Sequence, residues 1–193
     1  MRIIAGTHRG RRLVAPEGLT TRPMTDRVRE NLFNILGQTL EGAVVLDLFC
    51  GSGALGLEAL SRWAVFCMFV DADRDAVASA QANAAQLGLA ERARFMRHDA
   101  LRPGPRIRPP GRQGYTLLFI DPPYKMSAEP QGQAGLADMV AGLLGLGCVA
   151  PGAVAMIRTK RGTAIDLPWA GFVLTDTRSY GTTTLHLMTR SAT

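Results

Sequence analysis

From residue 44 onward, short apolar runs alternate with segments that are predicted to be helical. Residues 44–49, 66–70 and 115–120 are almost fully apolar, which is typical of strands buried on both faces. Helices are predicted at 54–62, 73–87 and 136–146. Because strands that are joined through helices run parallel, the alternation predicts an α/β fold with helices on both faces of a parallel sheet.

Four further strands complete the predicted sheet, at 93–96, 153–157, 172–177 and 182–189. The last two are joined too tightly for a helical crossover, so they are expected to pair antiparallel. The fold class is therefore a Rossmann-like, mostly parallel seven-stranded sheet with an antiparallel C-terminal strand. Ligands of such sheets bind beyond the carboxyl ends of the strands.

The composition fits one domain, 1–193, with a sizeable core, because 47% of the 193 residues are hydrophobic. No apolar run has the length of a transmembrane helix, and the N-terminus lacks the apolar stretch of a signal peptide. Cys50, Cys67 and Cys148 are widely spaced and form no Cys-x-x-Cys pair. We therefore expect a monomeric cytoplasmic protein without a disulfide framework or a metal site.

The net charge of +6 is concentrated near the N-terminus, where the first thirty residues hold seven arginines and three acids. Residues 2–5 and 11–15 are predicted to form a hairpin, and Asp26 is predicted to cap a helix that runs to about Leu36. A GC-rich genome would also favour arginine, but it would not concentrate the charge. We interpret residues 1–40 as a nucleic-acid-binding extension and 41–193 as the catalytic core. The candidate contacts are Arg9, Arg11, Arg12, Arg22, Thr25, Arg27 and Arg29.

A glycine loop, Cys50-Gly51-Ser52-Gly53, follows the apolar run 44–49 and opens a predicted helix. Glycines allow a tight turn and a close approach of the backbone to a ligand. A carboxylate at Asp47 would repel a pyrophosphate and would attract a cationic amino group. S-adenosylmethionine carries an ammonium and a sulfonium and no phosphate, so it fits this loop better than a dinucleotide does.

Two more aspartates stand at the ends of successive predicted strands. Asp71 is placed to accept hydrogen bonds from ribose hydroxyls, and Asp99 from an adenine amino group. Each aspartate alone would be explained by a helix cap or a turn, but their coincidence at strand ends favours a ligand. The cofactor candidates are Asp47, Phe49, Gly51, Ser52, Gly53, Asp71, Ala72, Asp99 and Ala100.

The tetrapeptide Asp121-Pro122-Pro123-Tyr124 follows the strand 115–120 directly. Its two prolines make a rigid turn that presents free carbonyl groups, a carboxylate and an aromatic ring at one point. Asp121 and the Pro122 carbonyl can accept the N–H groups of an exocyclic amine, which would make its nitrogen a better nucleophile. Tyr124 can stack on the base, which is worth roughly 1–3 kcal/mol. We take Asp121, Pro122, Pro123 and Tyr124 as the catalytic candidates.

Together, these elements resemble the class I S-adenosylmethionine-dependent N-methyltransferases. Nearly the whole chain is similar to one group of them, the bacterial RsmD-like enzymes, which methylate the exocyclic N2 of a guanine in 16S ribosomal RNA. Residues 2–6, 9–13, 22–34 and 47–62 carry the resemblance. It implies cofactor contacts at Asp47, Gly51, Gly53, Asp71 and Asp99, amine activation at Asp121 and Pro122, and base stacking at Tyr124. The partner that it implies is small-subunit ribosomal RNA or its assembly particle.

Two segments depart from the family pattern. Residues 102–114 form a longer arginine-rich surface loop than the resemblance implies. The segment Arg158-Thr159-Lys160-Arg161 is basic where the resemblance implies more acidic character, and it could contact phosphate.

The residues alone predict a methyltransferase that acts on an amino group, and other functions stay open. A DNA adenine-N6 or cytosine-N4 methyltransferase would use the same turn, but such enzymes usually carry an additional target-recognition region. A non-catalytic RNA-binding protein on this fold would be expected to have lost Asp121 or the glycines. A nucleotide-dependent oxidoreductase is disfavoured by Asp47.

Overall fold

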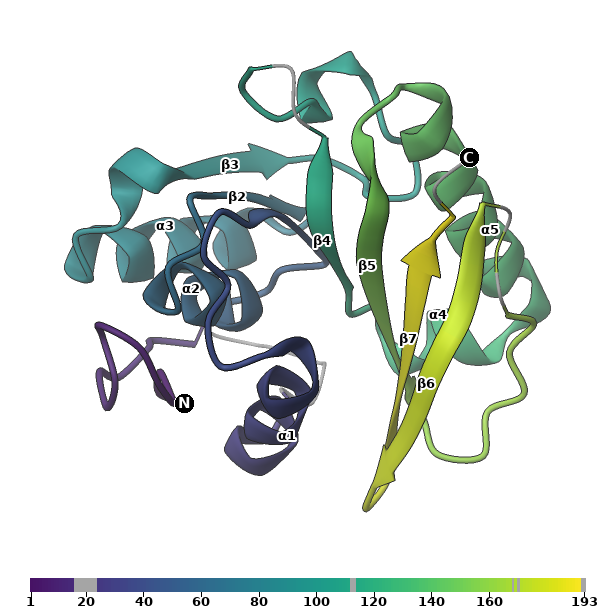
Figure 1. Cartoon of the computed structure of the whole chain (residues 1–193), viewed down its shortest axis with the longest axis horizontal. Helices are drawn as coiled ribbons and strands as arrows, with labels where there is room; N and C mark the ends of the chain where they lie inside the picture. The colour runs from purple at the N-terminus through teal and green to yellow at the C-terminus, as the bar shows by residue number, and fades with distance from the viewer. Residues whose placement is uncertain (16–23, 112–113, 168, 170, 192–193) are drawn as a thin grey trace.

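The centre of the molecule is a seven-stranded sheet in the order β3-β2-β1-β4-β5-β7-β6 (Figure 1). A computed structural model of the chain describes residues 1–15, 24–111, 114–167, 169 and 171–191, and the strands are counted within these residues. The strands are β1 (Val44–Leu48), β2 (Phe66–Asp71), β3 (Ala93–Arg97), β4 (Tyr115–Ile120), β5 (Val149–Lys160), β6 (Phe172–Tyr180) and β7 (Thr183–Arg190). Strands β1 to β5 pair in parallel, and β7 pairs antiparallel with both β5 and β6. The predicted sheet and its antiparallel C-terminal strand are confirmed.

Helices cover both faces of the sheet, as the alternation predicts. They are α1 (Asp26–Leu36), α2 (Ala54–Ser61), α3 (Arg74–Gln86), α4 (Tyr124–Ala128) and α5 (Pro130–Gly145), with the short 3-10 helices η1 (Ala90–Arg92) and η2 (Pro105–Ile107). Val45 of β1 belongs to the apolar cluster with α1, α2 and α3, whereas Leu46 and Leu48 belong to the cluster with α5. None of the helices in the described part of the chain is long and apolar enough to span a membrane.

The N-terminal arm, residues 1–15, has the shape of a hairpin but forms no strands in the structure. One antiparallel bridge joins Arg2 and Arg12. The Ile3 N–H also donates to the Arg11 carbonyl and the Leu13 N–H to the Met1 carbonyl, at 2.9 and 3.0 Å. The predicted hairpin is therefore confirmed, but its pairing is a single bridge, and the prediction of two regular strands was wrong. The N–H groups of Ile4 and Ala5 donate to the Glu58 carboxylate of α2, at 2.7 and 3.0 Å.

Glycine is required where the arm meets α2. Gly6 has a φ of +81°, and a Cβ atom at this position would lie 1.9 Å from the Ser61 carbonyl oxygen. The Ser61 hydroxyl donates to the Ala5 carbonyl at 2.7 Å and accepts from the His8 N–H at 3.0 Å. These contacts fix the arm on the core.

Helix α1 begins one residue earlier than its predicted cap would place it. Thr25 is the N-cap, and its hydroxyl accepts from the Val28 N–H. Asp26 is the first helical residue, and its carboxylate pairs with Arg2 at 3.2 Å and with Arg29 at 3.1 Å. The prediction that Asp26 caps the helix was wrong by one position.

The segments around α5 also differ from their predictions. Helix α4 was not predicted, and α5 begins at Pro130 rather than near Leu136, because its first turns contain proline and glycine and lack an apolar period. The loop 102–114 contains η2, whose Ile107 is fully buried. Its carbonyl accepts a hydrogen bond from the buried Tyr115 hydroxyl at 2.6 Å, so part of this segment is core rather than surface.

Candidate active site

The strand register brings the predicted site residues to one edge of the sheet. Leu48 of β1 is level with Val70 of β2 and with Ile120 of β4. The glycine loop, Asp71 and Asp121 therefore lie at the same height, at the carboxyl ends of three strands. These strands, β2, β1 and β4, are neighbours in the sheet (Figure 1). This convergence is the predicted one.

The glycine loop turns through positive backbone angles. Phe49, Gly51 and Gly53 have φ values of 59°, 54° and 78°, and Gly53 is the N-cap of α2. A Cβ atom at Gly53 would lie 3.1 Å from the Ala80 side chain, whereas one at Gly51 would meet no atom within 4 Å. Gly53 therefore serves close packing of the loop, and Gly51 leaves open space above it.

Asp47 lies beneath this loop and is 1% exposed. Its Oδ2 accepts the Gly56 N–H at 2.9 Å, and its Oδ1 has no hydrogen-bond partner among the described residues. Burial raises the pKa of Asp47 well above its ordinary value, and the hydrogen bond from Gly56 opposes the shift. An uncompensated buried carboxylate is costly and is expected to gain from a cationic partner.

Asp71 fixes the glycine loop to β2. Its Oδ2 accepts the Gly51 N–H at 2.9 Å, and its Oδ1 accepts the Asp73 N–H at 3.0 Å. Each carboxylate oxygen has a second acceptor position, so these bonds leave room for ribose hydroxyls. Ala72 beside it is exposed.

Asp99 lies at the rim of the site, with 52% of its side chain exposed. It accepts the Leu101 N–H at 3.0 Å, and its other oxygen lies 3.8 Å from the Arg102 Nε. Ala100 is 1% exposed and packs in the core. Asp99 is thus a turn-forming residue whose carboxylate stays accessible.

The Asp-Pro-Pro-Tyr turn joins β4 to α4. The Asp121 N–H donates to the Leu48 carbonyl at 3.4 Å, which ties the turn to the end of β1. Pro123 is the N-cap of α4, and Tyr124 is its first residue. The Tyr124 hydroxyl lies 2.9 Å from the Thr183 hydroxyl of β7, so the ring is anchored at its polar end.

Arg158 of β5 completes this cluster, and the sequence reading did not assign it to the site. Its Nε donates to Asp121 Oδ1, and its guanidinium carbon lies 5.0 Å from the centroid of the Tyr124 ring. Burial raises the pKa of Asp121, and the Arg158 guanidinium opposes that shift. The basic segment at the carboxyl end of β5 therefore does not act as one unit, because Arg158 is buried whereas Lys160 and Arg161 are exposed.

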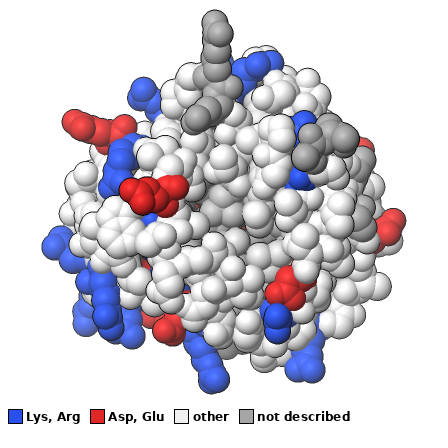
Figure 2. All heavy atoms as spheres, viewed as in Figure 1, with Lys and Arg blue, Asp and Glu red and all other residues white. Residues whose placement is uncertain are grey.

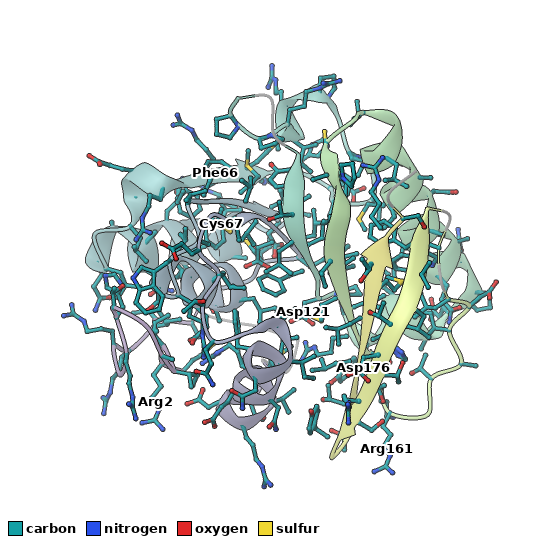
Figure 3. All side chains as sticks on the ribbon, in the orientation of Figure 1. Arg2, Phe66, Cys67, Asp121, Arg161 and Asp176 are labelled. Atoms are coloured by element: carbon teal, nitrogen blue, oxygen red, sulfur yellow. The ribbon has the colours of Figure 1, made fainter. Side chains whose placement is uncertain are left out.

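A groove of about 460 Å³ opens beside Tyr124 and Arg158. Its walls come from α1 and from the hairpin between β6 and β7, and Figure 3 shows Asp121 between these two elements. The lining residues are Met24, Thr25, Arg27, Val28, Asn31, Tyr124, Arg158, Ser179, Tyr180, Gly181, Thr182 and Thr183. Two guanidinium groups and several hydroxyl groups thus surround the approach to the catalytic turn.

The predicted nucleic-acid contacts divide into exposed and buried groups. Arg9, Arg11, Arg12 and Arg27 are exposed, and basic side chains gather at the lower left of Figure 2, where Figure 1 places the N-terminal arm. Thr25 is also exposed and lines the groove. Arg22 lies outside the described residues.

Arg29 is fully buried, so the prediction that it contacts nucleic acid was wrong. Its Nη2 donates to the Arg2 carbonyl and to Asp26, and its Nε lies 3.9 Å from Glu58. A guanidinium at this position holds α1 against the arm and α2. The sequence of α1 alone could not reveal that Arg29 is buried, because its partners lie elsewhere in the chain.

Asn83 of α3 is a second residue that the sequence reading missed. It is fully buried, and its amide accepts the Val14 N–H at 2.8 Å. Its amide nitrogen donates to the carbonyls of Val14 and Ser52 at 2.9 and 3.0 Å. Asn83 therefore joins the arm to the glycine loop.

Comparisons with known proteins agree with this arrangement. A family model described as Conserved hypothetical protein 95 matches residues 1–189. The chain is also 33% identical to yhhF of Escherichia coli, provisionally described as a methyltransferase, whose solved structure superposes with a TM-score of 0.80 over 100% of this chain and 99% of that one. The chain belongs to the RsmD-like methyltransferase family.

Curated relatives carry names from this family. YlbH of Bacillus subtilis (strain 168), provisionally described as an rRNA methyltransferase, is 44% identical over 65% of this chain and 67% of its own length. Ribosomal RNA small subunit methyltransferase D of Escherichia coli (strain K12) is 42% identical over 65% of this chain and 61% of its own length. An RNA methyltransferase of Salinibacter ruber, solved with S-adenosyl-L-homocysteine, is 16% identical with a TM-score of 0.63 over 88% of this chain and 94% of that one, and it shows the shared fold.

The residues of this RsmD-like chain fit S-adenosylmethionine. The unpartnered Asp47 oxygen suits the cationic amino group, and the open space above Gly51 admits a ligand to the loop. Asp71 offers further acceptor positions at the next strand end. Within the described residues, His, Cys, Asp and Glu form no cluster of three or more with metal-binding geometry.

Proposed function

We propose that this chain methylates the exocyclic N2 of a guanine in small-subunit ribosomal RNA. The observation that carries the proposal is the position of the Asp-Pro-Pro-Tyr turn directly beside the glycine loop, with a groove lined by Tyr124 and Arg158 on its outer side. The family membership and the names of the relatives support ribosomal RNA as the substrate. The choice of guanine N2 rests on the resemblance described above.

Asp47, Gly51, Gly53, Asp71 and Asp99 would hold the cofactor. When bound, S-adenosylmethionine supplies a methyl carbon to which the amine nitrogen bonds as the carbon–sulfur bond breaks, its electron pair passing to sulfur and one amine proton being released.

The catalytic turn would prepare the amine. The Asp121 carboxylate and the Pro122 carbonyl accept its two N–H groups, which draws the lone pair out of the base and towards the methyl group. Tyr124 provides a stacking face for the base, so much of the rate enhancement comes from orientation. A guanine in folded RNA must leave its stack to reach this turn, and the groove of about 460 Å³ beside Tyr124 would receive it.

The exposed arginines of the arm would bind phosphate groups on either side of the target. Arg9, Arg11, Arg12 and Arg27 are candidates for bidentate contacts. Binding should therefore weaken steeply as the salt concentration rises. Because Glu58, Ser61 and Asn83 fix the arm to the core, RNA held by the arm would be held at a set distance from the turn.

The roles assigned to the turn can be tested with Asp121→Asn and a matched control, Asp138→Asn, on the exposed surface of α5. Asp121→Asn is expected to lose methyl transfer to small-subunit particles and to keep the cofactor affinity of the unmodified protein. Asp138→Asn should keep both. Full turnover by Asp121→Asn, measured with labelled methyl groups, would show that the carboxylate does not activate the amine.

A further inference from the structure

Arg158 stands where a methyl-transferring site would not be expected to place a positive charge. The register pairs Ile120 with Ile157, so Asp121 and Arg158 follow side by side at the ends of β4 and β5. Their side chains are 15% and 7% exposed, and the Arg158 Nε donates to Asp121 Oδ1. An amine that receives a methyl group gains positive charge, and a neighbouring guanidinium opposes that change. An arginine kept here therefore needs a compensating role.

The contacts of Arg158 indicate that role. A planar guanidinium can pair with a carboxylate and stack on an aromatic ring at the same time. Arg158 does both, because it bonds to Asp121 and lies over the Tyr124 ring at 5.0 Å. The hydroxyl end of that ring is held by Thr183 at 2.9 Å. The acceptor carboxylate and the stacking ring are thus joined through one side chain.

We propose that Arg158 is a positioning residue for the target base: it holds the Asp121 carboxylate and the Tyr124 ring in fixed relative positions before the base enters. This inference rests on the proposed function. The guanidinium covers one face of the Tyr124 ring and directs the base to the opposite face. A carboxylate has about four acceptor positions, so the bond from Arg158 leaves positions for the amine.

Arg158 also favours the ionised form of Asp121, which is the form that accepts hydrogen bonds from an amine. The charged and titratable groups around this carboxylate are Asp47 on β1, Arg158 on β5 and Tyr124 on α4. Burial favours the protonated form, and Arg158 is the group that opposes it. Removal of the guanidinium should therefore raise the pKa of Asp121.

The test compares Arg158→Met and Arg158→Lys with the control Arg106→Met. Arg106 is exposed in η2, which contacts the amino end of β4 through Tyr115, so the control makes the same charge change at the opposite edge of the sheet. Methyl transfer is measured as a function of pH with the cofactor saturating and the particle concentration varied, and cofactor affinity is measured separately. The Asp121 carboxyl is titrated by NMR in protein carrying ¹³C-labelled aspartate, with Asp121→Asn identifying its signal.

For Arg158→Met we expect the acidic limb of the pH profile and the midpoint of the Asp121 NMR titration both to move to higher pH. The rate at the plateau should fall roughly tenfold or more, because the ring is no longer held in place. Arg158→Lys should return the Asp121 titration to that of the unmodified protein, because the positive charge is kept. Its KM for the particles should stay above that of the unmodified protein, since an ammonium does not stack on a ring as a guanidinium does. Cofactor affinity should stay unchanged in all variants.

Two results would overturn the proposal. One is an Arg158→Met protein with an unchanged pH profile and plateau rate. The other is a loss of activity that accompanies loss of cofactor binding and is not reversed in any part by lysine, which would mark Arg158 as merely structural. Absence of methyl transfer by the unmodified protein would instead contradict the proposed function, and the NMR titration would still report whether Arg158 controls Asp121.

Discussion

Replacement of Arg29 by methionine separates a structural arginine from a nucleic-acid-binding one. Arg29 and Arg27 are two residues apart in the same helix, yet Arg29 is fully buried and Arg27 is exposed in the groove. Methionine keeps the helix propensity and most of the side-chain length in both variants. Arg27→Met is therefore the matched control for Arg29→Met.

The expected loss of stability follows from the contacts of Arg29. Removal of one partner from a buried ion pair costs about 3–5 kcal/mol. Two features reduce the loss. Glu58 keeps its ion pair with the Arg62 Nε, at 2.8 Å, and 39% of the Asp26 side chain is exposed to water. Burial also lowers the pKa of Arg29, and its Nε and Nη1 have no hydrogen-bond partner among the described residues. We expect the low end of the range, about 3 kcal/mol.

Urea unfolding followed by circular dichroism measures this free energy. Arg27→Met should lie within about 0.5 kcal/mol of the unmodified protein, as exposed substitutions usually do. RNA affinity, measured where all variants are folded, should fall for Arg27→Met and hold for Arg29→Met. If Arg29→Met unfolded at the unmodified midpoint and weakened RNA binding as much as Arg27→Met, the structural role given to Arg29 would be refuted.

Three further perturbations test the packing and the electrostatics of the core. Gly56→Ala would place a Cβ atom 2.4 Å from the Phe69 ring, so thermal unfolding should show a loss of about 2 kcal/mol; an unchanged midpoint would contradict this packing. Tyr115→Phe removes the buried bond to the Ile107 carbonyl and should cost about 1 kcal/mol in urea unfolding, whereas a gain in stability would show that the bond is not formed. The raised pKa of Asp47 means that stability of the cofactor-free protein declines as pH rises from the ordinary aspartate pKa through the raised one. Asp47→Asn should abolish that part of the decline when the free energy of unfolding is measured at a series of pH values. An equal decline in Asp47→Asn and in the unmodified protein would refute the raised pKa of Asp47.

Much of the fold could be predicted because its signals are local. Strand β4 has the predicted bounds, since an apolar run that ends at Asp121-Pro122 has a sharp chemical boundary. The grouping of Asp47, Asp71 and Asp121 followed from the rule that parallel strands present their carboxyl ends at one edge. These features need no knowledge of distant contacts.

The features that escaped prediction depend on distant partners. Arg29 looked like its exposed neighbours, because its burial depends on Glu58 and on the Arg2 carbonyl. Arg158 lies 37 residues from Asp121, and only the register of β4 with β5 brings them together. The arm is fixed on the core by N–H groups that donate to Glu58 and Asn83, which lie on α2 and α3. In each case a side chain on another element decided the outcome.

The identity of the methylated nucleoside tests the central claim most directly. Small-subunit particles from cells that lack this gene would be incubated with the purified protein and S-adenosylmethionine carrying a labelled methyl group, beside free RNA and total DNA. The RNA and DNA would then be digested to nucleosides and separated by mass spectrometry. The account predicts that the label appears in N2-methylguanosine from the particles and disappears with Asp121→Asn. Label in N6-methyladenine or N4-methylcytosine of the DNA, or no label in any substrate when cofactor binding is intact, would contradict it.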